Sequence, residues 1–139
     1  PAMAMLAQLD PQENVREVAR RCLQKHGVDG KAADLFVAQA RDYLKRGIGQ
    51  GAYSDVVWSL VDDKLVATEV PALVYPYELA KACAHNAVAI DPMSADARSL
   101  VAQSCLGEAQ IIEASLVATP DDEALKGIEA MVPEFQLAR

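Results

Sequence analysis

Three prolines that each follow a capping residue do most to limit the folds open to this chain: Asp10-Pro11, Asp91-Pro92 and Thr119-Pro120. Proline lacks an amide hydrogen and has a fixed φ, so a helix tolerates it in the first turn but not in its interior. Asp and Thr side chains can cap a helix N-terminus. Each dipeptide also separates two apolar stretches with helical spacing. These three dipeptides therefore predict helices that begin near the prolines.

Apolar residues at intervals of three and four predict about six helical segments. The expected ranges, in chain order, are Asp10–His26, Lys31–Arg46, Tyr53–Ala67, Pro76–Ala89, a segment from Ser94 to Ala118, and a last helix after Thr119 that Pro133 ends. Helix and strand compete most closely in the third range. Val56-Val57 favours a strand, but Trp58 to Leu65 keeps helical spacing, so a helix is predicted there. The glycine-rich turn Gly47–Gly51 is expected to divide two sub-bundles.

Composition narrows the class of protein. The 139 residues suit a single domain over 1–139, and aromatic residues make up only 5%, so the core must be mostly Ala, Leu, Val and Ile. A net charge of −7 argues against nucleic acid and against an anionic membrane surface as partners. No apolar run is long enough to span a bilayer. Three widely spaced cysteines do not form a disulfide framework, which predicts a reducing, cytoplasmic location.

A repeated sequence motif indicates how the helices are stacked. Leu9-Asp10-Pro11 is followed by Val15-Arg16, and Ile90-Asp91-Pro92 is followed by Ala97-Arg98. Such self-similarity is typical of helical hairpins that bury their apolar faces only against their neighbours. The prediction is an all-α fold of stacked antiparallel helical hairpins, a short right-handed α-solenoid of about six helices.

Two repeat families resemble parts of this pattern. Lys81–Leu106 looks like the junction of two tetratricopeptide repeats, with Ala80, Ala84 and Ala87 at small positions and Pro92 at the closing proline. Arg98 and Cys105 depart from that family, which prefers large aromatic residues there. Asp10–Leu23 looks equally like a HEAT-type helix. Both resemblances imply a protein-binding solenoid, and together they cover about a third of the chain.

No constellation in the sequence predicts catalysis, a metal site or a cofactor. Cys22 and His26 are four residues apart and can share a helix face, whereas Cys83 and His85 are two apart and point in different directions. Neither spacing matches a standard zinc pattern, and small buried thiols account for cysteines on apolar stripes. Gly47-x-Gly49-x-Gly51 lacks the strand and the Lys-Ser or Lys-Thr pair of a phosphate-binding loop. We therefore expect no enzyme, no metal and no cofactor.

Basic residues and one tyrosine supply the candidate partner-binding site. If the first two predicted helices pack antiparallel, Arg16, Arg20, Tyr43 and Lys45 border a shared groove; in tetratricopeptide-like clamps such grooves hold acidic peptide tails. The alternative is a solvated face balanced by neighbouring acids. The predicted function is a non-enzymatic interaction or scaffolding module that binds a peptide or helix of a partner protein. Two alternatives stay open: a fragment of a larger self-assembling solenoid that forms a homodimer, and a small helical ligand-binding protein or enzyme.

Overall fold

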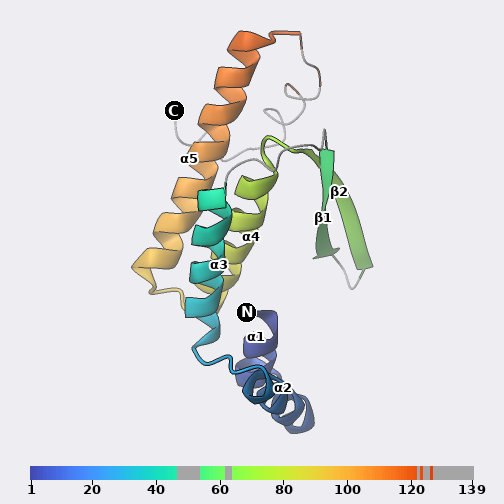
Figure 1. Cartoon of the computed structure of the whole chain (residues 1–139), viewed down its shortest axis with the longest axis vertical. Helices are drawn as coiled ribbons and strands as arrows, with labels where there is room; N and C mark the ends of the chain where they lie inside the picture. Colours follow the sequence, from blue (N-terminus) through green and yellow to red (C-terminus); the bar gives the residue numbers. More distant parts are fainter. Residues whose placement is uncertain (47–53, 62–63, 122, 124–125, 127–139) are drawn as a thin grey trace.

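Helices dominate the computed structural model, which describes residues 1–46, 54–61, 64–121, 123 and 126 (Figure 1). Five helices and one two-stranded sheet lie in these residues. In chain order they are α1 (Ala2–Leu9), α2 (Glu13–Lys25), α3 (Ala32–Arg46), β1 (Ser54–Val61), β2 (Lys64–Pro71), α4 (Tyr75–Ile90) and α5 (Ala95–Ala118). The mostly helical class is confirmed, while six helices and solenoid stacking stay predictions. The turn Gly47–Gly51 and nearly all of the predicted last helix lie outside the described residues.

Three long helices form the main layer of the fold. Helices α3, α4 and α5 lie side by side, and each runs antiparallel to the one before it (Figure 1). Their facing sides are built mostly from alanine, which lets helix axes approach closely and pack at high density. The buried members of this core are Phe36, Val37, Ala40, Ala80, Ala84, Ala87, Ala97 and Leu100. The alanine stripe of the predicted Pro76–Ala89 helix is therefore the inner face of α4.

We expect Ala84→Leu to destabilise this layer. Ala84 has no exposed surface, so the extra carbons of leucine must displace the neighbouring helices. Overpacking of a dense core costs about 1–3 kcal/mol. The matched control is Ala82→Leu, because Ala82 is exposed on the same helix. Chemical denaturation should show the loss for Ala84→Leu alone; equal curves for the two variants would contradict the close packing of α4.

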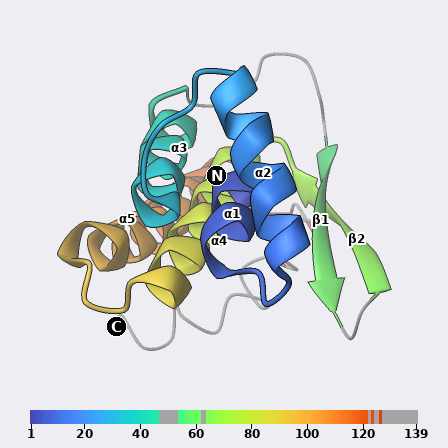
Figure 2. The ribbon, with the colours of Figure 1, turned by 90° about the horizontal axis from the view of Figure 1, so that it is seen from below.

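Helices α1 and α2 form a separate pair at one end of the three-helix layer (Figures 1 and 2). They pack on each other, and each contributes buried alanines, Ala4 and Ala7 from α1 and Ala19 from α2. Helix α1 also touches α3, so it links the pair to the layer. The main contacts of α2 are with α1 and those of α3 are with α4, so the first two predicted helices do not form a closely packed antiparallel hairpin.

The predicted helix Tyr53–Ala67 is wrong, because the structure places a β-hairpin in this region. Strands β1 and β2 pair antiparallel, with Trp58 opposite Ala67 and Leu60 opposite Leu65. Val57 and Val70 share one face of the hairpin and pack against the second core cluster, which contains Val74 and Ile112. Val70 is buried and Val57 is half-buried, whereas residues 64–69 of β2 are exposed, so only part of this face is covered by the helices. In a strand, residues two apart lie on one face, which places Val57 and Val70 together.

All three dipeptides end a helix, and after the two Asp-Pro dipeptides the next helix begins later than the proline. Asp10, Asp91 and Thr119 are the C-cap residues of α1, α4 and α5, and each backbone N–H still donates to the carbonyl four residues earlier. The residue before a proline disfavours helical ψ, so the helix stops there. In both Asp-Pro turns the aspartate Oδ1 accepts from the amide two residues on, at 2.9 Å for Asp10 and 3.1 Å for Asp91. The new helices begin later, α2 after its N-cap Gln12 and α5 after Ser94, whose side chain caps Ala97.

Candidate functional site

An open groove lies where the end of α2, the start of α1 and one side of α3 meet. Its volume is about 590 Å³. The apolar side chains that line it are Pro1, Met3, Leu23, Val28, Leu35 and Ala38. Cys22, His26, Gln39, Asp42 and Tyr43 complete the wall. A mainly apolar groove with a few polar groups is the usual form of a ligand-binding site.

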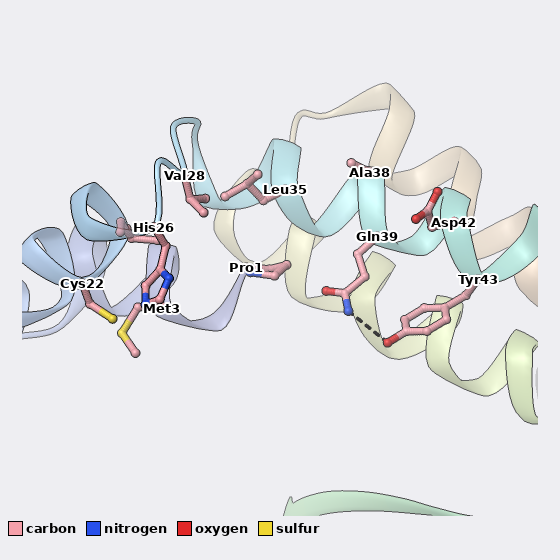
Figure 3. Close-up of a pocket in the computed structure, with 11 residues that line it drawn as sticks. Pro1, Met3, Cys22, His26, Val28, Leu35, Ala38, Gln39, Asp42 and Tyr43 are labelled. Carbon is pink, nitrogen blue, oxygen red and sulfur yellow. Dashed lines mark hydrogen bonds between the residues drawn. The ribbon is translucent and has the colours of Figure 1, made fainter.

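The polar groups of this groove sit toward its two ends. Figure 3 shows Cys22, His26 and Met3 gathered at the α2 end, and Gln39, Asp42 and Tyr43 along α3. Gln39 Nε2 donates a hydrogen bond to the Tyr43 hydroxyl oxygen at 2.9 Å. This bond orients both side chains one helical turn apart. The groove therefore has an apolar lining between two ends with different polar groups: a thiol and an imidazole at the α2 end, and an amide, a carboxylate and a phenol along α3.

The four residues predicted to bind a partner do not meet at one place. Tyr43 lines the groove, but Arg16, Arg20 and Lys45 do not. Arg16 and Arg20 both form ion pairs with Glu13 on their own helix, the Arg20 pair at 3.1 Å. These interactions hold the pKa of the Glu13 carboxyl below its usual value. Lys45 is exposed near the end of α3. Much of the predicted basic stripe is thus balanced by local acids.

A buried ion cluster joins α4 to α5 away from the groove. Lys81 Nζ lies 2.9 Å from Glu78 Oε1 and 2.9 Å from Glu108 Oε2. The Glu108 side chain is 0% exposed and that of Lys81 14%. Two carboxylates thus share one ammonium group in a low-dielectric place, and the second oxygen of Glu108, Oε1, has no hydrogen-bond partner.

The cluster shifts the protonation of its members. Burial raises the pKa of Glu108 to about 7, and the neighbouring Glu78 carboxyl adds to this shift while Lys81 opposes it. The pKa of Lys81 is raised above its usual value by its bonds to the two carboxylates, which outweigh its own burial. Lys81 therefore stays charged while Glu108 titrates near neutrality. Since none of the three residues lines the groove between α2 and α3, we expect the cluster to act first on stability.

The sequence analysis did not single out Glu108, although its position in the sequence gave some indication of a buried ion pair. Glu108 continues the buried stripe of α5, made of Ala97, Leu100, Ser104, Glu108 and Ile112. A buried glutamate on an apolar stripe needs a partner of opposite charge, and Lys81 is the one Lys or Arg of α4. Met3 and Leu35 had no such signal, because the groove depends on how the α1–α2 pair meets α3.

In the part of the chain that the structure describes, no cluster of three or more His, Cys, Asp or Glu side chains could hold a metal ion. The three cysteines are all half-buried and are not joined by disulfides. No described helix combines the length and the apolar character needed to cross a membrane.

Comparisons with protein-family models, with curated proteins and with solved structures found no match to this chain.

Proposed function

We propose that this protein is a non-enzymatic interaction module that binds an apolar helix or peptide of a partner protein in the groove between α2 and α3. The observation that carries the proposal is the groove itself, with Leu23, Leu35 and Ala38 in its apolar lining. Its volume of about 590 Å³ suits a few large side chains of an amphipathic helix. A partner helix that fits this groove would carry apolar residues three and four positions apart, so that they lie on one face.

The charge of the chain favours a basic partner. The formal net charge is −7, and Asp42 lies at the α3 end of the groove. Arg16 and Arg20 are paired with Glu13, which leaves little support for a clamp that holds an acidic peptide tail. Lys or Arg residues beside the apolar face of the partner would therefore speed its association with this protein. Added salt would weaken this effect.

A peptide selection tests this proposal. A display library of amphipathic helical peptides is selected against the parent protein, and each enriched peptide is then measured on Ala38→Arg. Ala38 is exposed on the groove wall, so arginine fills the groove and repels a basic partner without disturbing the core. We expect affinity to fall at least about tenfold, which corresponds to about 1.4 kcal/mol.

The matched control is Ala82→Arg on the exposed side of α4. Both substitutions place arginine four residues from an acid on the same helix, Asp42 in one case and Glu78 in the other. Peptides should bind the control variant as tightly as the parent. A library that yields no peptide sensitive to Ala38→Arg would contradict binding in the groove.

A second candidate function, self-assembly, is favoured by the outer face of the β-hairpin. Trp58 is 64% exposed and Leu65 72%, and both lie on the face opposite Val57 and Val70. A two-stranded hairpin has marginal stability alone and gains from further strands or a covering surface. If a second copy covers this face, light scattering should show a dimer that Leu65→Lys dissociates. A parent protein that stays monomeric at high concentration would rule this candidate out.

A further inference from the structure

The α2 end of the groove brings together three side chains that soft metal ions favour. Cys22 and His26 lie one turn apart at the end of α2, where the His26 amide donates to the Cys22 carbonyl at 3.2 Å. Met3 comes from α1, the helix that packs on α2. All three line the groove, and Figure 3 shows their side chains gathered at the same end of it.

We propose that Cys22, His26 and Met3 form a binding site for the cuprous ion, Cu(I). Thiolate, thioether and imidazole are the soft and borderline ligands that Cu(I) prefers. A pair four residues apart on a helix presents two ligands to one ion, as metal-binding histidine pairs do. Methionine is a poor ligand for zinc, calcium and magnesium, so the set selects against the harder ions.

The surroundings of the three side chains suit a soft, weakly hydrated ion. Leu23 and Val28 lie in the same wall, so the ion would be held against an apolar surface. Cys22 is half-buried, while Met3 and His26 are exposed enough for an ion to reach them from solvent. Binding displaces the thiol proton of Cys22 to solvent and changes no oxidation state. The site shares the groove with the proposed peptide but uses different side chains, and ion binding is measured without any peptide, so the inference does not depend on the proposed function.

A Cu(I) titration of the parent protein tests the site. Cu(I) is added under nitrogen as its acetonitrile complex, in competition with the chromophoric chelator bicinchoninate. We expect one equivalent to be withdrawn from the chelator by the parent protein. Cys22→Ser should weaken binding about 100-fold, and Met3→Leu or His26→Gln about tenfold each.

The chain provides its own control in Cys83 and His85. They are two residues apart on α4, and a helix turns by about 100° per residue, so their side chains diverge. Cys83→Ser and His85→Gln should leave the affinity for Cu(I) unchanged. Loss of binding in either of these variants, or equal affinity in Cys22→Ser and the parent, would overturn the assignment. Zinc competing on equal terms with Cu(I) would overturn the soft-ion selectivity, and circular dichroism verifies that each variant is folded.

Discussion

Replacing Lys81 by methionine is expected to lower the free energy of unfolding by about 3–5 kcal/mol at pH 8. Methionine keeps most of the volume and the apolar stem but removes the ammonium group that Glu78 and Glu108 share. The buried carboxylate of Glu108 then has no opposite charge, and an unpaired buried charge is among the most costly defects in a protein interior. Urea denaturation of parent and variant at pH 8 gives the difference.

The same variant should recover much of its stability at pH 5. The folded-state pKa of Glu108 is already raised to about 7, and loss of Lys81, which opposes that rise, raises it further. A protonated Glu108 carries no charge, so the deficit should shrink to about 1 kcal/mol. Adding Glu108→Gln to the Lys81 variant should restore stability at pH 8 in the same way. A deficit that is equal at pH 5 and pH 8 would show that lost packing, and not the charge of Glu108, is the cause.

Glu108→Gln alone is expected to flatten the pH dependence of stability. Because the pKa of Glu108 is higher in the folded protein than its usual 4.5, the folded state binds the proton more tightly. Its stabilising contribution is complete below about pH 4.5 and is lost as pH rises toward about 7, at about 1.4 kcal/mol per pH unit. The parent should therefore lose about 3 kcal/mol over this window relative to the glutamine variant. Parallel curves for the two proteins between pH 5 and pH 8 would refute the raised pKa.

Most helices were predictable because their burial pattern lies in the sequence at regular intervals. The alanines at positions 80, 84 and 87 fall on one face, and they are the buried face of α4. The role of the prolines was predicted less well. Asp10-Pro11 satisfies the sequence rule for an N-cap, but the preference of a pre-proline residue for extended ψ wins, and Asp10 closes α1 instead.

The β-hairpin could not be predicted securely, because its sequence fits two periods. Val57, Leu60, Val61 and Leu65 are spaced as on a helix face, and no Asn-Gly or Asp-Gly dipeptide marks a turn between the strands. What decides for strands is tertiary: Val57 and Val70 find an apolar surface formed by Val74 and Ile112. The groove could not be predicted for a similar reason. It forms where α1 and α2 contact α3, and no local sequence pattern indicates which helices contact each other.

Ile112→Ala is expected to detach the β-hairpin from the helices and to cost about 2–5 kcal/mol. Ile112 is 1% exposed and packs with Val70 and Val74, the residues that lead from β2 into α4. Truncation leaves a cavity under the hairpin, and two strands without a packed face are marginally stable. Hydrogen exchange should therefore quicken most at the amides of β2, ahead of those around Phe36 and Ala40 in the first core.

The control for this variant is Val117→Ala, in the last turn of the same helix. Val117 is 81% exposed, so its truncation should change stability by less than about 0.5 kcal/mol. Denaturation compares the loss of unfolding free energy in the two variants, and hydrogen exchange shows in which elements the amides exchange faster. Uniform acceleration across β2, α3 and α4 in Ile112→Ala would mean that the hairpin and the helices unfold as one unit. Such a result would make the hairpin part of the main core, held there by Ile112, and would exclude independent detachment of the strands.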